Sequence, residues 1–148
     1  GRDEQRLKAM AGPTIRFMGR LSDSEVLQYV AHCRAFLFPG EEDFGITPLE
    51  AQASGRPVIA YGAGGALASV IDGITGTFFR EQTVESLAAV LAAFDERQYS
   101  PQAIRDHALE FDKPHFQRRI LQFIETKMGA NRTQVTGWNA PPSNEFVH

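Results

Sequence analysis

The sequence contains only one cysteine, Cys33, among its 148 residues. A single cysteine excludes an internal disulfide and a zinc site built from several cysteines. Because Cys33 lies within a helical pattern, we expect it to be a small buried side chain rather than a nucleophile. The four histidines are scattered along the chain, and no Ser-His-Asp set, Cys-His set, HExxH motif or EF-hand spacing is present. The sequence therefore predicts no metal site and no nucleophilic triad.

The sequence also has no excess of positive charge and no long hydrophobic run. The formal net charge at pH 7 is −3, so the overall charge gives no reason to expect nucleic acid or anionic lipid as a partner. No apolar run approaches the roughly 18 to 20 residues of a membrane span, and the start of the chain lacks the apolar centre of a secretory signal. Hydrophobic residues make up 43% of the chain, as in an ordinary globular domain. We therefore expect a cytoplasmic protein, with the inner face of the membrane as an alternative place.

Short apolar segments alternate with helical patterns along the chain. Segments that are short, apolar and bounded by Gly or Pro are predicted as strands, namely residues 15–19, 35–39, 57–61 and 76–79. Patterns of helical period are predicted as helices, namely residues 1–11, 22–33, 49–53, 66–71, 84–94, 101–111 and 115–128. The alternation predicts an α/β fold with a four-stranded parallel sheet. We expect one domain over residues 1–128 and a loosely held, aperiodic tail over residues 129–148.

Two of the predicted helices begin with recognisable signals. Ser22, followed by Glu25 three residues later, is typical of a capping box. The apolar face of that helix would carry Val26. Thr47 is expected to cap a later helix, with Pro48 at the first helical position, where a missing N–H costs nothing.

The segment from Pro39 to Gly65 combines two carboxylates, a helix start and a glycine-rich turn: PGEEDFGITPLEAQASGRPVIAYGAGG. Glu42 and Glu50 are separated by seven residues. In parallel sheets, ligands bind beyond the carboxyl ends of the strands. The loop that carries Glu42 and the glycine turn at residues 62–65 both follow predicted strands, so we expect them at one rim of the sheet. The segment therefore predicts a pocket for a polyhydroxylated, phosphorylated ligand.

The same residues allow plainer interpretations. Glu50 could stabilise its helix through the helix dipole instead of accepting hydrogen bonds from a ribose diol. Glu42 could be a solvated charge in an acidic turn. The backbone N–H groups of Gly45, Ile46 and Thr47 can converge on an anion, because the first helical turn leaves donors unpaired.

This segment resembles the donor-binding region of retaining GT-B glycosyltransferases of the GT4 family, also called group 1. That family carries E-x-F-G-x-x-x-x-E, then A-x-A-x-G-x-P-V-I-A and a Gly-Gly turn. Glu42 and Glu50 match its two glutamates, and Phe44 and Gly45 match its F-G pair. The resemblance continues through IDGITGTFF and reaches back to IRFMGRLSDSEVLQYVAHCRAFLFP, so it covers about residues 15–94.

The resemblance implies a Rossmann-like parallel sheet flanked by helices, the C-terminal half of a GT-B fold. It implies a catalytic role for Glu42, which would contact hydroxyls of the transferred sugar. Glu50 would hold the ribose hydroxyls of the nucleotide. The amides of Gly45, Ile46 and Thr47 would face the diphosphate or the sugar. The other donor-binding positions that it implies are Phe44, Gly19, Arg20, Leu21, Gly64 and Gly65.

The implied reaction is transfer of a hexose, with retention, from a nucleotide-diphospho-sugar to an acceptor hydroxyl in surface polysaccharide or glycoconjugate synthesis. Backbone dipoles and basic side chains would stabilise the leaving diphosphate, so no cofactor and no obligatory metal are expected. The acceptor, a glycan or lipid-linked sugar, would bind an N-terminal domain that this chain lacks, and that half could also provide peripheral membrane association. We therefore expect this part alone to be inactive. The pattern GGAL…VIDG…TG is similar to that of members acting on mannose.

The sequence departs from the family pattern at Ala68, where members often carry a Glu after the glycine pair. The Arg and Lys that grip the diphosphate in the family lie on elements that this chain does not contain. Two other functions stay open, a non-catalytic GT-B-like partner module and a nucleotide-sugar epimerase of the same architecture. The donor nucleotide stays open among GDP, UDP and ADP.

Overall fold

The computed structural model describes residues 3–131 and has a parallel sheet at its centre. Strands β1 (Phe36–Phe38), β2 (Val58–Tyr61) and β3 (Gly76–Phe79) lie in that order. Helix α3 (Ile46–Ala53) connects β1 to β2, and α4 (Ala66–Ser69) connects β2 to β3. In the register, Val58 lies opposite Phe36 on one side and Gly76 on the other. The predicted α/β fold with a parallel sheet is confirmed, with three strands among the described residues instead of four.

The strand predicted over residues 15–19 is wrong, because these residues are irregular in the structure. The N–H of Ile15 donates to the carbonyl of Gly12 over 3.1 Å, which closes only a local turn. Within residues 3–131 this segment pairs with no strand, and a strand needs a neighbour to bind its backbone N–H and C=O groups. Ile15 and Met18 remain exposed. Apolar composition alone therefore does not make this segment a strand.

Helix α2 (Asp23–His32) begins with the predicted capping box. The Ser22 hydroxyl accepts a hydrogen bond from the Glu25 N–H, and the Glu25 carboxylate accepts one from the Ser22 N–H over 2.8 Å. The cap fixes where the helix begins, but it does not bury the helix. No residue of α2 is buried, and the predicted apolar face leaves Val26 exposed.

Helix α3 begins at Ile46, with Gly45 as its N-cap and no side-chain cap. The prediction that Thr47 caps this helix, with Pro48 at the first position, is therefore wrong by two residues. Gly45 has a φ of 71°, in the left-handed region that residues with a Cβ rarely adopt. Pro48 is still tolerated, because the first turn of a helix has N–H groups without intrahelical acceptors.

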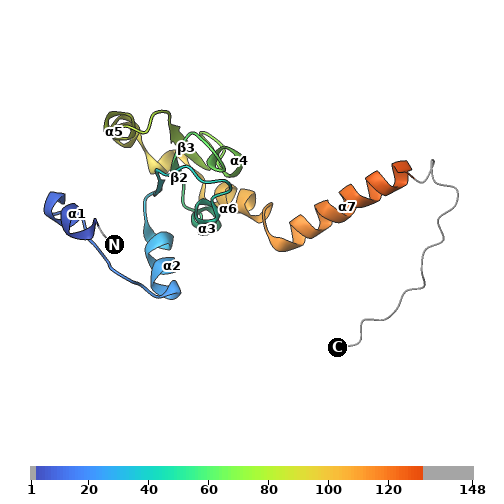
Figure 1. Ribbon diagram of the computed structural model, residues 1–148, viewed down its shortest axis with the longest axis horizontal. Helices are drawn as coiled ribbons and strands as arrows, with labels where there is room; N and C mark the ends of the chain where they lie inside the picture. Colours follow the sequence, from blue (N-terminus) through green and yellow to red (C-terminus); the bar gives the residue numbers. More distant parts are fainter. Residues whose placement is uncertain (1–2, 132–148) are drawn as a thin grey trace.

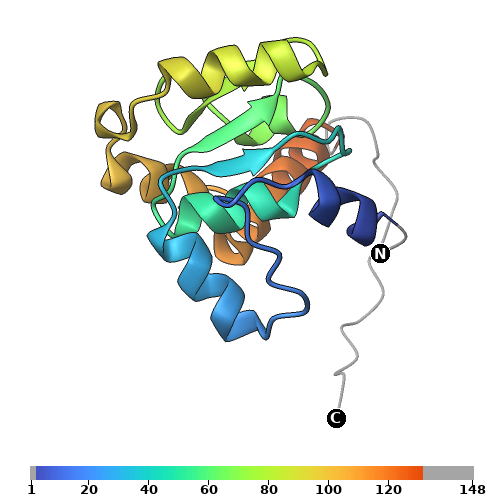
Figure 2. The ribbon, with the colours of Figure 1, turned by 90° about the vertical axis from the view of Figure 1, so that its left-hand side faces the viewer.

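The core lies between the sheet and the helices that cover its two faces (Figure 2). Helix α5 (Val84–Ala93) covers one face, and α3 packs against β1 and β2 on the other. Helix α6 (Pro101–Leu109) packs in turn against α3, and Ile104 of α6 is fully buried. The buried residues of the main apolar cluster are Phe38, Ala51, Val58, Ala60, Ala66 and Val70.

Helices α1 (Glu4–Met10) and α7 (Lys113–Asn131) extend away from the sheet on opposite sides (Figure 1). A short 3₁₀ helix, η1 (Glu96–Gln98), precedes α6. Helix α7 runs three residues beyond the predicted end at residue 128, and the rest of the predicted tail, residues 132–148, lies outside the described residues. No helix in the described part of the chain is both long and apolar enough to cross a membrane.

Candidate functional site

The loop after β1 and the glycine turn after β2 touch each other at the carboxyl ends of their strands. The N–H of Gly65 donates a hydrogen bond to the carbonyl oxygen of Glu42 over 2.7 Å. Gly64 has a φ of 54°, and a Cβ at this position would lie 2.5 Å from the same carbonyl oxygen. A Cβ at Gly65 would collide with the backbone of Phe44. The two loops therefore share one rim, as the sheet topology led us to expect, and glycine allows their close approach.

The backbone amides at the start of α3 are open on the outer side of this rim. Gly45 is buried, whereas Ile46 and Thr47 are exposed. These positions belong to the first turn of a helix of eight residues, whose N–H groups have no acceptor within the helix. The positive end of the helix dipole lies at the same point. This end of α3 can therefore receive an anionic group such as a phosphate.

The glycine turn is a weaker candidate than the start of α3 for binding an anion. Helix α4, which follows it, has only four residues, so its dipole contributes little. The N–H of Gly65 is already bonded to the Glu42 carbonyl, so it is not free to bind a ligand. In this arrangement both glycines allow the close approach of the two loops, and the donor-binding role expected for Gly64 and Gly65 stays a prediction.

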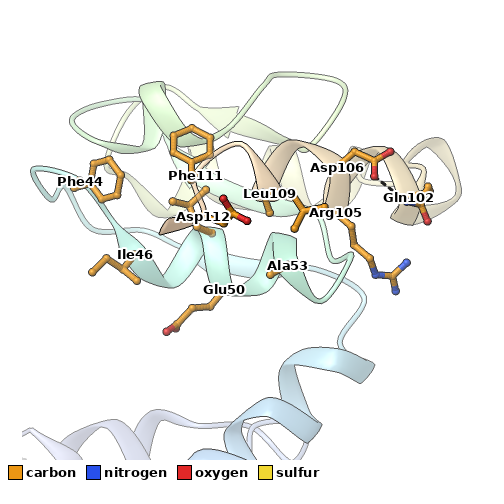
Figure 3. A pocket seen from close by; sticks show the side chains of 12 residues that line it. Phe44, Ile46, Glu50, Ala53, Gln102, Arg105, Asp106, Leu109, Phe111 and Asp112 are labelled. Carbon is orange, nitrogen blue, oxygen red and sulfur yellow. Dashed lines mark hydrogen bonds between the residues drawn. The ribbon is translucent and has the colours of Figure 1, made fainter. Parts of the chain in front are cut away.

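Glu50 and Glu42 are both exposed. Glu50 borders a hollow of about 610 Å³ between α3 and the corner where α6 leads into α7. Figure 3 shows its side chain directed away from α6 at the edge of this hollow. Glu42 is not among the residues that line it. The two carboxylates therefore belong to one loop–helix unit, with Glu42 on the rim loop and Glu50 one turn into α3.

The hollow is mainly apolar near the rim and charged at its other end (Figure 3). Phe44 packs edge-on against Phe111, with ring centroids 6.4 Å apart, which holds the rim loop against the α6–α7 corner. Arg105 lies at the other end, where its guanidinium approaches the carbonyl of Ser54 over 3.5 Å. Among the described residues, no group of three or more His, Cys, Asp or Glu side chains could hold a metal ion.

Asp112 borders the same hollow and caps α7. Its carboxylate accepts hydrogen bonds from the backbone N–H of His115 over 2.8 Å and from the His115 ring over 2.9 Å. The backbone bond first, and then the ring bond, lower the pKa of Asp112 below its ordinary value. The carboxylate therefore stays ionised at neutral pH and fixes the start of α7.

The three residues Gly19, Arg20 and Leu21 lie in the segment before α2. Gly19 has a φ of 66°, and both Gly19 and Arg20 are exposed. Within residues 3–131, no hydrogen bond or ion pair joins these residues to the rim loops. The backbone bond from Gly65 to Glu42 thus has no counterpart in this segment, and the donor-binding role expected for Gly19, Arg20 and Leu21 stays a prediction.

A buried polar cluster behind the glycine turn was not predicted from the sequence. Its centre is the carbonyl oxygen of Ser69, to which the Gln52 amide donates over 2.7 Å and the His107 ring over 3.2 Å. Gln52 and Ser69 are fully buried. Their partners are 17 and 38 positions away along the chain, so no local pattern signals the cluster. A glutamine on the inner face of a short helix was the available hint, since such a side chain needs a partner.

Several known proteins are similar to about half of this chain. The α-1,3/1,6-mannosyltransferase ALG2 of Dictyostelium discoideum is 37% identical over 73 residues, which are 49% of this chain and 17% of the relative. The D-inositol 3-phosphate glycosyltransferase of Kribbella flavida is 39% identical over 74 residues, covering 47% of this chain and 18% of the relative. The glycogen synthase of Mycobacterium tuberculosis is 36% identical over 77 residues, covering 51% of this chain and 19% of the relative. The chain thus spans less than a fifth of the length of these curated relatives.

A solved structure and a family model extend the likeness to most of the chain. The sucrose-phosphate synthase of Thermosynechococcus elongatus superimposes with a TM-score of 0.69 at 24% identity, over 88% of this chain and 35% of that protein. This likeness agrees with the Rossmann-like half of a GT-B fold. The family model described as "Glycosyl transferases group 1" matches residues 2–110. The resemblance seen in the sequence is confirmed, and the chain belongs to the group 1 glycosyl transferases.

Proposed function

We propose that this chain forms the donor-binding part of a glycosyltransferase that uses a nucleotide-diphospho-sugar. The observation that carries the proposal is the loop–helix unit at the carboxyl rim. In that unit the exposed carboxylates Glu42 and Glu50 flank the open amides at the start of α3. Carboxylates accept hydrogen bonds from vicinal hydroxyls, and helix-start amides bind phosphate. A nucleotide-diphospho-sugar carries both kinds of group in one molecule.

Each group of this unit receives one part of the donor. Glu50 accepts two hydrogen bonds from the ribose diol of the nucleotide. The amides of Ile46 and Thr47 face the diphosphate, where they stabilise the negative charge that develops as the sugar leaves. Glu42 binds hydroxyls of the transferred hexose next to the reacting carbon. Gly64, Gly65 and Phe44 hold the rim loop in place through the contacts described above.

The proposal extends to the whole enzyme of which this chain is a part. That enzyme transfers a hexose, with mannose as the first candidate, to an acceptor hydroxyl with retention at the anomeric carbon. The support for a hexose is that relatives carry the names mannosyltransferase and glycogen synthase. Further parts of the enzyme bind the acceptor glycan or lipid-linked sugar and complete the diphosphate site, and no obligatory metal takes part.

The test is a calorimetric titration of GDP, UDP and ADP into the full-length protein and into its Glu50→Gln variant. Loss of the charged acceptor should weaken the preferred nucleotide about tenfold or more, since hydrogen bonds to charged groups contribute roughly 1.5–3 kcal/mol. Glu85→Gln is the matched control, because Glu85 is an exposed carboxylate in the first turn of α5, on the other face of the sheet.

A 2′-deoxy form of the preferred nucleotide sharpens the result. It should bind more weakly than the ribonucleotide to the wild type, but no more weakly to Glu50→Gln, because the hydroxyl and the carboxylate act as a pair. Equal affinity of the wild type and Glu50→Gln for every nucleotide would overturn the assignment of the ribose to Glu50.

A further inference from the structure

A closed ring of contacts links the site to α6. Starting from the rim, the Gly65 N–H binds the Glu42 carbonyl over 2.7 Å, and the Gly65 carbonyl accepts from the Ser69 hydroxyl over 3.1 Å. The Ser69 carbonyl then accepts from the His107 ring over 3.2 Å. His107 packs edge-on against Phe111 at 5.2 Å between centroids, and Phe111 contacts Phe44 of the rim loop. The two routes from His107 therefore meet again at the same loop.

We propose that His107 is a positioning residue for the donor site, acting through Ser69 on the glycine turn and through Phe111 on the rim loop. His107 is half-buried on the side of α6 that faces α4. Within residues 3–131, no hydrogen bond joins it to Glu42 or to the open amides of α3. Its effect is to fix the distance between the turn and the loop, and with it the direction of the Glu42 side chain.

The bonding pattern fixes which ring nitrogen carries hydrogen. The Ser69 carbonyl is an acceptor only, so Nε2 of His107 must be the donor. The Ser69 carbonyl already receives the Gln52 amide over 2.7 Å, and two donors use its two lone pairs. A side chain at position 107 therefore needs an N–H at the end of a planar group in order to reach the Ser69 carbonyl. A glutamine can supply such a donor, and a leucine cannot.

The effect of His107 on donor binding rests on the proposed function, whereas its effect on the contact between the glycine turn and the rim loop does not. The first measurement is therefore hydrogen exchange of the Gly65 amide in the full-length protein without nucleotide. His107→Leu should raise this exchange rate roughly three- to tenfold, which is the factor by which the loss of about one intramolecular hydrogen bond shifts a local opening equilibrium. His107→Gln should restore most of the protection. The amide of Ile59 in the central strand should exchange as in the wild type in both variants.

The second measurement compares the affinity for the preferred nucleoside diphosphate with that for the bare nucleoside. His107→Leu should lower the affinity for the nucleoside diphosphate about three- to tenfold and leave the affinity for the nucleoside unchanged, because the rim and the α3 amides face the diphosphate. Ser69→Ala is a second variant that cuts the same path at its hydroxyl and should raise Gly65 exchange likewise. His32→Gln is the control, since His32 bonds only within α2, to the Gln28 carbonyl.

The outcomes of these measurements test the positioning role of His107 separately from the proposed function. Unchanged Gly65 exchange in both His107→Leu and Ser69→Ala overturns the positioning role, whatever the nucleotide affinities are. Raised exchange with unaltered diphosphate affinity overturns the role in donor binding. If the wild-type protein binds none of the nucleotides, the proposed function fails, and the coupling is still judged by the exchange at Gly65.

Discussion

The N–H of Gly65 and the carbonyl oxygen of Glu42 lie 2.7 Å apart and form the hydrogen bond that joins the two loops of the rim. The bond uses the backbone of Glu42 and leaves its carboxylate exposed. One residue thus performs two tasks, because its backbone holds the rim together while its side chain is free to meet a ligand. Substitutions at the two ends of this bond should therefore have different effects.

Gly65→Ala should disturb the rim directly. A Cβ at Gly65 would collide with the backbone of Phe44, so the loop must move away from the turn. Overpacking of this kind costs about 1–3 kcal/mol of unfolding free energy. The measurement is urea unfolding, combined with nucleotide titration, in which the affinity should fall as the loop is displaced.

Gly40→Ala provides the control within the same loop. A Cβ at Gly40 would meet nothing within 4 Å, so its unfolding free energy should stay within about 0.5 kcal/mol of the wild type. If Gly65→Ala were as stable as Gly40→Ala and bound nucleotide equally well, the tight contact at the rim would be refuted.

Glu42→Gln should separate sugar recognition from nucleotide recognition. The backbone bond to Gly65 persists in this variant, so the rim keeps its shape. The loss of a charged acceptor should lower the affinity for a nucleotide-diphospho-sugar about tenfold, or by roughly 1.4 kcal/mol, and leave the affinity for the nucleoside diphosphate unaffected. Competition titrations of the two ligands measure this difference. Asp43→Asn, which changes the neighbouring exposed carboxylate, should alter neither affinity, and an equal loss for both ligands would argue against the role of Glu42.

The three strands could be predicted from the sequence because each is a short apolar run that ends at a turn. The run at residues 57–61 became β2, the central strand, in which Val58 and Ile59 are fully buried. The run at residues 15–19 is also short and mainly apolar but has no strand to pair with in the described part of the chain. Pairing depends on distant residues, so composition could not distinguish the two cases. The start of α3 was misplaced because Thr47 and Pro48 are strong local signals, whereas the conformation of Gly45 decided the boundary.

For the candidate site, too, the sequence predicted some features and not others. The chain order of strands and loops was enough to predict that the Glu42 loop and the glycine turn share a rim. The hydrogen bond from the Gly65 amide to the Glu42 carbonyl depends on distances between loops, which the sequence does not contain. The contact between Ser69 and His107 spans 38 positions, and nothing in either local segment indicates the other. Long-range hydrogen bonds were therefore the part of the site that required coordinates.

Gln52→Met should change stability little despite the complete burial of Gln52. The substitution removes the bond from the Gln52 amide to the Ser69 carbonyl, and it also removes the side-chain oxygen, which is buried without a partner. The two effects oppose each other, and the volume is nearly preserved, so the loss should stay below about 1.5 kcal/mol. Gln52→Ala would leave a cavity and should cost about 2–4 kcal/mol. Urea unfolding of both variants measures this, and equal losses would show that the hydrogen bond, not the packing, is what matters.

The start of α7 should loosen in acid because of Asp112. The His115 backbone N–H and ring hold the pKa of Asp112 below its ordinary value, so the carboxylate stabilises the folded state above about pH 4, the ordinary range for aspartate. This contribution should disappear as the pH falls through the lowered pKa in the folded protein. An NMR titration of the Asp112 carboxyl should show a midpoint below that of an exposed aspartate, together with loss of the His115 amide protection. Asp112→Asn should remove this acid response, whereas Asp106→Asn, on α6 and bonded to Gln102, should retain it. A midpoint at or above the ordinary value would contradict the cap.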